Sequence, residues 1–297
     1  MPPKRTFYRG RFAPTPTGPL HFGSLVTAVA SYADALYHKG EWILRFDDID
    51  ESRKISESVD TILRTLEVFG FEWAAKPTFQ TERKELYHSI LSGLLQDDLA
   101  YYCGCSRKEV KDAGRRTELG IIYPGTCRNG LPSGSVGRSI RMRVNHKSTQ
   151  FVDRFAGPIK QNLGKEVGDF VVGRADGYTA YQLAVVVDDS VENITHIIRG
   201  ADLLTSTPRQ LYLQIQLGLD VPSYGHIPLV VDSRGTKLSK STGASAVSTD
   251  YPLNLLLAAW KFLGQSPPDR PLADVSEFWS EATNIWSAKR ITTINKK

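Results

Sequence analysis

The N-terminal part of the chain alternates between strand and helix patterns, and this order restricts the possible folds more than any other feature. Residues Thr6–Phe12 and Glu41–Phe46 are rich in large apolar side chains, which is typical of buried strands. Between them, apolar residues recur at helical spacing from Leu20 to Tyr37. A strand, a helix and a second strand in this order form a βαβ unit. We therefore predict an α/β fold with a parallel sheet.

A loop rich in proline and glycine, Arg11–Ser24 (RFAPTPTGPLHFGS), joins the first strand to the helix. Its position predicts an anion site, because the unpaired N–H groups and the dipole at a helix N-terminus both attract negative charge. Gly18 and Gly23 would let the backbone approach a phosphate, and His21 could donate a hydrogen bond to it. The alternative is a simple turn before an amphipathic helix, with an ordinary surface histidine. The loop alone leaves both interpretations open.

A second loop carries two lysines around a serine, Lys237–Ser241 (KLSKS). Such a loop can wrap a triphosphate and offset the charge on a pyrophosphate leaving group. On its own it is equally typical of a solvated surface loop. Together the two loops predict a site that closes on one ATP.

The rest of the chain contains further helices, an insertion and late strands. Helical spacing appears at Val59–Phe69 and Glu82–Gln96, and residues 103–137 are rich in Gly, Cys, Arg and Pro, as an insertion would be. The pattern predicts strands at Ser139–Val144, Phe170–Val172, Leu183–Val187 and Ile194–Ile198. We therefore divide the chain into the first half of an α/β domain (1–100), an insertion (101–178), the second half of that domain (179–245) and a helical C-terminal module (246–297).

Three cysteines lie within that insertion, at Cys103, Cys105 and Cys127. An odd number in a chain without a secretion signal argues against a disulfide framework. Thiolates one residue apart, with a third from a nearby turn, can bind one soft cation such as zinc. Three reduced loop thiols without a metal remain the alternative.

The composition fits a protein of the cytoplasm. The apolar runs fall far short of the ~20 residues that a membrane span requires, and Met1–Gly10 has no signal-peptide core. The net charge of +5 is compatible with a polyanionic partner but does not demonstrate one. We expect a monomer that does not bind membranes.

Several ordered motifs resemble those of one enzyme family. HFGS at residues 21–24 is similar to the HIGH signature of class I aminoacyl-tRNA synthetases, and KLSKS is similar to their KMSKS signature. RFAPTPTGPLHFG is most similar to the glutamyl subgroup, and LRFDDID, QTER, DGYTAYQLAVVVDD and THIIRGADLLTSTPRQ match it further along the chain. The resemblance implies a Rossmann-type catalytic domain of this class, split by an insertion that contacts RNA. It also implies activation of L-glutamate with ATP and Mg²⁺.

Only residues 242–297 follow the second signature, which leaves no room for the anticodon-binding region of glutamyl-tRNA synthetases. The chain therefore best resembles the truncated paralogues, the glutamyl-queuosine tRNA(Asp) synthetases. That resemblance implies transfer of glutamate to the queuosine base in the anticodon loop of tRNA(Asp). The basic segments Arg107–Lys111 and Arg138–Arg143 could contact such an RNA. Two alternatives stay open, a truncated conventional synthetase that charges the tRNA 3′ end and a non-catalytic RNA- or zinc-binding module.

The resemblance also implies roles for individual residues. The catalytic residues would be His21, Lys237 and Lys240. Glutamate would be held by Arg11, Phe12, Ala13, Pro14, Thr15, Asp47, Tyr181 and Arg199. ATP would be held by His21, Gly23, Ser24, Lys237, Ser239 and Lys240. One zinc ion per chain would be held by Cys103, Cys105, Tyr123 and Cys127. Many relatives have glutamate where Asp47 stands, so a water or Asp48 could replace its contact with the substrate ammonium.

Overall fold

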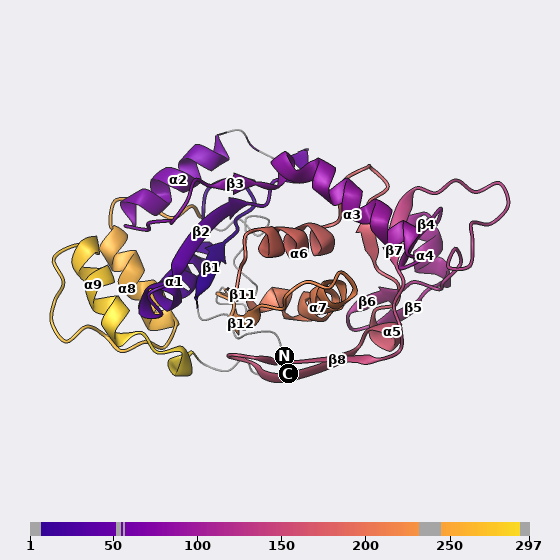
Figure 1. Ribbon diagram of the computed structural model, residues 1–297. Helices are drawn as coiled ribbons and strands as arrows, with labels where there is room; N and C mark the ends of the chain where they lie inside the picture. Colours follow the sequence, from indigo (N-terminus) through magenta and orange to yellow (C-terminus); the bar gives the residue numbers. More distant parts are fainter. Residues whose placement is uncertain (1–6, 52–54, 56, 232–244, 292–297) are drawn as a thin grey trace.

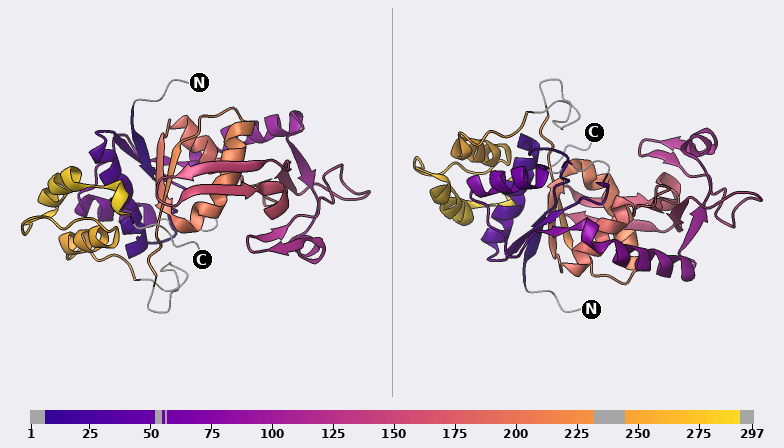
Figure 2. Two further views of the ribbon diagram at one scale, coloured as in Figure 1. Left: turned by 90° about the horizontal axis from the view of Figure 1, so that it is seen from below. Right: turned by 90° about the horizontal axis from the view of Figure 1, so that it is seen from above.

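The computed structural model describes residues 7–51, 55, 57–231 and 245–291. The molecule is elongated, with the C-terminal helices at one end, the parallel strands and their helices in the middle, and the cysteine-containing segment at the other end (Figures 1 and 2). In these described residues, no helix is long and apolar enough to cross a membrane.

Parallel strands form the centre of the fold, as the N-terminal pattern predicts. Strands β1 (Arg9–Phe12), β2 (Glu41–Phe46) and β3 (Thr78–Phe79) pair in parallel in that order, and β11 (His196–Gly200) pairs in parallel with β12 (Ser223–Ile227). The two sheets lie edge to edge, because the Thr195 backbone N–H donates to the Arg9 carbonyl at 2.9 Å. The carboxyl ends of β1, β2, β11 and β12 therefore meet at one edge, where ligands bind in open α/β sheets.

Helix α1 (Phe22–Tyr37) crosses from β1 to β2 and is covered by the C-terminal helices α8 (Pro252–Phe262) and α9 (Val275–Ile285). The buried side chains of these helices join β1 and β2 in one hydrophobic cluster, in which Trp260 and Phe278 are almost completely enclosed. The C-terminal helices are thus packed into the main core and do not stand apart from it (Figure 1).

Asp34, on α1, ties three distant segments together. Its fully buried carboxylate accepts hydrogen bonds from Tyr8 Oη at 2.5 Å, Trp286 Nε1 at 2.9 Å and both terminal nitrogens of Arg154 at 2.6 and 2.9 Å. Burial alone would raise the pKa of this carboxyl group, but the bonds from Arg154, Tyr8 and Trp286 outweigh it and lower the pKa. Asp34 therefore stays ionised inside the protein.

One predicted strand is wrong. Leu183–Val187 belongs to helix α6 (Tyr181–Val191), and all five of its residues are at most 2% exposed. A short apolar run is compatible with a buried helix as well as with a buried strand, because a helix packed on all sides has no polar face to reveal its period. The predicted strand Thr6–Phe12 begins before β1, which starts at Arg9, and the bounds of the remaining predicted strands lie within two residues of observed ones.

The segment between the two parallel sheets forms its own antiparallel sheet, ordered β10-β7-β4, and two hairpins. The strands and helices not yet given are α2 (Ser58–Val68), α3 (Lys84–Gln96), β4 (Ala100–Cys103), α4 (Arg107–Ala113), β5 (Arg115–Thr117), β6 (Gly120–Ile122), β7 (Ser139–Met142), β8 (Ser148–Asp153), β9 (Gly157–Asn162), α5 (Leu163–Glu166), β10 (Val171–Gly173) and α7 (Thr207–Gln216). The short 3₁₀ helices are η2 (Gln80–Arg83), η3 (Ala201–Ser206) and η5 (Ala288–Arg290).

Candidate functional site

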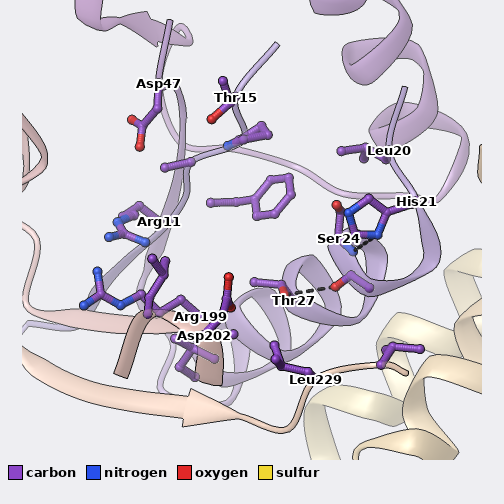
Figure 3. A pocket seen from close by; sticks show the side chains of 18 of the residues that line it. Arg11, Thr15, Leu20, His21, Ser24, Thr27, Asp47, Arg199, Asp202 and Leu229 are labelled. Atoms are coloured by element: carbon purple, nitrogen blue, oxygen red, sulfur yellow. Dashed lines mark hydrogen bonds between the residues drawn. The ribbon is translucent and has the colours of Figure 1, made fainter. Parts of the chain in front are cut away.

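A cavity of about 300 Å³ opens at the carboxyl edge of the parallel strands (Figure 3). The residues lining it include most of those that the resemblance implies: Arg11, Phe12, Ala13, Pro14, Thr15, His21, Gly23, Ser24, Asp47, Tyr181 and Arg199. They come from the end of β1, the first turn of α1, the end of β2, the start of α6 and β11. Figure 3 shows the cavity with Asp47, Arg11 and Arg199 along one side and His21 and Ser24 along the other.

Arg11 is held in place by an acidic partner. Its Nε and Nη2 donate to the two carboxylate oxygens of Asp189, on α6, at 3.1 and 3.2 Å, and both side chains are buried. The bidentate pair fixes the plane of the guanidinium. Arg11 therefore enters the cavity with its charge already balanced.

Asp47 stands beside a fully buried arginine. Arg45 Nε donates to Asp47 at 2.9 Å, and Arg45 Nη1 donates to Asp189 at 2.9 Å and to Glu192 at 2.7 Å. Burial raises the pKa of Asp47 to about 6, and Arg45 opposes this only in part. Asp48 is directed elsewhere, because its two oxygens accept from the backbone N–H and hydroxyl of Thr81. Asp47 and Asp202 both line the cavity, so an ammonium group could meet either carboxylate there.

Arg199 differs from Arg11, because its partners are neutral. It is 3% exposed and donates from Nε to His226 at 3.0 Å and from Nη2 to Thr207 at 2.9 Å and Gln210 at 2.6 Å. Among the described residues, no carboxylate lies within ion-pair distance of Arg199 and its Nη1 has no hydrogen-bond partner. A buried guanidinium without an anion is costly, so an anion bound at this cavity wall would offset that cost.

The opposite wall is the N-terminus of α1. His21 is its N-cap residue, and its Nδ1 accepts from the Ser24 backbone N–H at 3.3 Å. Gly23 and Ser24 lie in the first helical turn, whose N–H groups and dipole favour an anion. Gly18 has φ of 130°, a backbone conformation that glycine adopts readily.

The KLSKS motif, with Lys237, Ser239 and Lys240, lies outside the described residues. The described residues on either side of it are at the site. Val230 lines the cavity, Ala246 forms an antiparallel bridge with His21, and the Val247 N–H donates to the Leu20 carbonyl at 2.8 Å.

The three cysteines converge on Tyr123. Their sulfur atoms all lie within 4.8 Å of one another, and the Tyr123 hydroxyl lies 3.3 Å from Cys103 Sγ and 3.5 Å from Cys105 Sγ. A tetrahedral zinc ion would separate its sulfur ligands by about 3.8 Å and a sulfur from an oxygen by about 3.5 Å. Cys105 Sγ and Cys127 Sγ are 3.6 Å apart, so the donor set fits zinc.

The surroundings of Cys103 favour a thiolate. Burial raises the pKa of Cys103, but its hydrogen bonds with Tyr123 and Arg141 bring the pKa down to about 7. Arg141 Nε donates to Cys103 Sγ at 3.3 Å, and its guanidinium stacks on the Tyr123 ring at 3.8 Å. Only a deprotonated sulfur is a metal ligand, so this arrangement prepares the group for metal binding.

A wider cleft of about 910 Å³ runs from the cysteine cluster to Tyr181. Arg107, Lys111 and Arg138 line it with exposed side chains, as an RNA-binding role would require. Arg141 does not fit that role, because it is buried and bonded to Cys103 and to the Asp169 carbonyl. The basic segment Arg138–Arg143 is therefore partly structural.

Sequence reasoning missed the buried residues that hold the cavity-lining side chains in place. Asp189, Arg45, His226 and Asp153 are all buried and paired, and none was assigned a role, although Arg45 and Asp189 lie within the matched stretches LRFDDID and DGYTAYQLAVVVDD. The only sequence signal was the pair Asp188-Asp189 at the end of an apolar run, because two buried acids require cationic partners.

Comparisons with known proteins show the family to which the chain belongs. Residues 8–296 match the family model for "tRNA synthetases class I (E and Q), catalytic domain". The chain is 47% identical to a glutamyl-Q tRNA(Asp) synthetase of Janthinobacterium sp. (strain Marseille), covering 95% of this chain and 97% of the relative. It is 49% identical to one of Dechloromonas aromatica (strain RCB), covering 94% of each.

Among solved structures, the chain resembles a glutamate tRNA ligase from Elizabethkingia meningosepticum in complex with its amino acid. The TM-score is 0.76 at 25% identity, over 97% of this chain and 66% of that one. Glutamate-tRNA synthetase from Elizabethkingia anophelis gives a TM-score of 0.77 at 25% identity, over 96% of this chain and 67% of that one. The chain therefore belongs to the glutamyl-Q tRNA(Asp) synthetase family of class I aminoacyl-tRNA synthetases, which are ATP-dependent ligases.

Proposed function

We propose that this protein activates L-glutamate as an adenylate and transfers it to the queuosine base in the anticodon loop of tRNA(Asp). The observation that carries the glutamate step is the unpaired Arg199 guanidinium at the cavity wall. Glutamate has one more carboxylate than the reaction consumes, and that side-chain group needs a fixed cation. Arg11 is less suited to this, because Asp189 already occupies two of its donors.

The remaining polar groups suggest how the substrates lie. Asp47 would accept the substrate ammonium, and Tyr181 and Thr15 would complete the amino-acid site. The triphosphate would lie against His21 and the first turn of α1, and Lys237 and Lys240 would offset its charge. The α-carboxylate of glutamate then attacks the α-phosphorus in line, and pyrophosphate leaves. Bound Mg²⁺ supplies positive charge to the phosphates.

The cysteine cluster would serve the second substrate. Zinc held by Cys103, Cys105, Cys127 and Tyr123 would fix the shape of the segment that carries Arg107 and Arg138. These side chains line the cleft that leads to Tyr181, so a nucleotide of the RNA could approach the adenylate from there. Helical RNA ends are recognised largely through backbone shape and 2′-hydroxyls.

Glutamate-dependent ATP–pyrophosphate exchange tests the first step. We expect exchange with the purified protein, and a loss of about 100-fold or more in kcat/KM for glutamate in an Arg199→Gln variant. The matched control, Arg64→Gln on the exposed face of α2, should keep wild-type activity. Lys240→Ala should lower the exchange rate more than it weakens glutamate binding. A folded wild-type protein without exchange would exclude the enzymatic function.

The acceptor is tested with labelled glutamate and tRNA(Asp) with and without queuosine. We expect label to stay on the RNA after its 3′-terminal nucleotides are removed, and only when queuosine is present. Label that leaves with the 3′ end would identify a truncated conventional synthetase instead.

A further inference from the structure

Behind Arg199 lies a buried chain of two more side chains that do not touch the cavity. His226, on β12, accepts from Arg199 Nε at its Nε2 and lies 2.5 Å from Asp153 through its Nδ1. His226 is 0% exposed and Asp153 is 1% exposed. Neither side chain lines the cavity, and His226 contacts Arg199, which does.

The hydrogen bonds define the position of the imidazole proton. A guanidinium nitrogen can only donate, so His226 Nε2 accepts and carries no proton. Its Nδ1 then carries the proton and donates to Asp153 Oδ2. Asp153 cannot turn away, because its Oδ1 accepts backbone N–H groups of Phe155 at 3.0 Å, Ala156 at 2.9 Å and His226 at 3.1 Å.

This arrangement fixes the orientation of the Arg199 guanidinium without neutralising its charge. The carboxylate of Asp153 is separated from the guanidinium by a whole imidazole ring, whereas Asp189 contacts Arg11 directly. A carboxylate placed on Arg199 itself would compete with an anionic ligand for the same donors. A neutral acceptor on Nε and two more on Nη2 fix the guanidinium plane, and Nη1 has no hydrogen-bond partner among the described residues.

We propose that Asp153 and His226 are positioning residues for the side-chain carboxylate of the amino-acid substrate. Asp153 selects the tautomer of His226, and His226 in that tautomer holds Arg199 in the orientation that meets the carboxylate. The proposal rests on the proposed function, because it takes Arg199 as the group that binds this carboxylate. It adds two specificity-determining residues outside the cavity.

Asp153→Asn tests the tautomer. The amide oxygen of the new residue can still accept the three backbone N–H groups, which places its NH₂ where Oδ2 was. That NH₂ would donate to His226 Nδ1, so the imidazole proton would move to Nε2 and face the Arg199 Nε–H. Two donors facing each other would displace the guanidinium. We expect the KM for glutamate in pyrophosphate exchange to rise about 10- to 100-fold, with the KM for ATP unchanged.

A second pair of variants tests His226 and does not depend on the folding of the first. The amide group of glutamine reaches the position of Nε2, whereas that of asparagine reaches only that of Nδ1. His226→Gln should therefore retain an acceptor for Arg199 and activate glutamate better than His226→Asn. Asp60→Asn, on an exposed turn of α2, serves as the matched control and should behave as wild type.

The outcomes separate this proposal from the function on which it rests. Both proposals are supported if the wild type shows exchange with glutamate, if Arg199→Gln loses this activity, and if Asp153→Asn raises the KM for glutamate selectively. Three results would overturn the positioning role alone. They are an unchanged glutamate KM in folded Asp153→Asn, equal changes in the KM for ATP and for glutamate in that variant, and equal activity of the two His226 variants. Absence of exchange in the wild type, or unaltered glutamate binding in Arg199→Gln, would overturn the proposed function.

Discussion

Replacing Asp47 with asparagine should remove a pH dependence that the wild-type protein shows in glutamate activation. An ammonium group needs an ionised partner, and burial raises the pKa of Asp47 to about 6. The kcat/KM for glutamate reports groups of the free enzyme, so it should rise with pH through this value. Between pH 7 and pH 5 the ionised fraction of such a group falls about tenfold, and kcat/KM should fall with it.

The size of the mutational effect follows from the contacts of Asp47. A hydrogen bond to a charged group contributes about 1.5–3 kcal/mol, so Asp47→Asn should lower kcat/KM for glutamate about 10- to 150-fold at pH 7.5. The variant should still fold, because Arg45 keeps Asp189 at 2.9 Å and Glu192 at 2.7 Å. Its activity should also be nearly flat between pH 5 and pH 7.

Stability should move in the opposite direction. The folded pKa of Asp47 lies above its ordinary value of 3.8, so the folded state holds this proton more tightly. The contribution of Asp47 to stability is then greatest at low pH and is lost as the pH rises through about 6.

Pyrophosphate exchange measured from pH 5 to pH 8, with Asp60→Asn as the control, tests the predicted pH dependence of glutamate activation. A flat wild-type profile, or the same inflection in Asp47→Asn, would refute it.

Three further perturbations have defined outcomes. Metal analysis should give one zinc per chain, and the Cys105→Ser variant should contain none. In that variant, RNA transfer should fall more than pyrophosphate exchange. Equal loss of the two activities in a folded variant would show that the metal does not act mainly in RNA transfer. Asp34→Ala should lower the free energy of unfolding by about 3–5 kcal/mol in denaturant titration, because Arg154 loses a buried partner, and a change below 1 kcal/mol would contradict this. Gly70→Ala should destabilise by about 1–3 kcal/mol, because Gly70 has φ of 69° and a Cβ there would lie 2.5 Å from Val275 Cγ1; an unchanged melting temperature would show that α9 can shift.

The parts of the fold that the sequence predicted well are those encoded locally. The apolar periods of the Leu20–Tyr37 helix and of the Glu41–Phe46 strand are visible within a short stretch of sequence, and the predicted strand matches β2 residue for residue. Leu183–Val187 was assigned to the wrong class, because the burial that decides between strand and helix comes from segments far away in the chain. The β8–β9 hairpin was missed; β8 (STQFVD) has three β-branched or aromatic residues among six, but β9 (GPIKQN) has one and also carries a proline.

The candidate site shows the same division. Residues at the cavity surface belong to contiguous motifs, so their types and spacing reveal them. His226 and Asp153 could not be found in this way, because their roles depend on a hydrogen bond between residues 73 positions apart. A buried acid and a buried histidine have no local pattern that separates them from ordinary core residues.

The pairing of β1 with the segment that starts β11 also bears on how the protein is made. A ribosome releases the chain from its N-terminus, yet β1 cannot complete its pairing until Thr195 has emerged, and Asp34 must wait for Trp286. Until then the apolar face of α1 lacks α8 and α9, its covering helices. Loop closure over such distances is slow, and an exposed apolar face favours aggregation. The nascent chain should therefore depend on chaperones for most of its synthesis and become resistant to proteases only near its end.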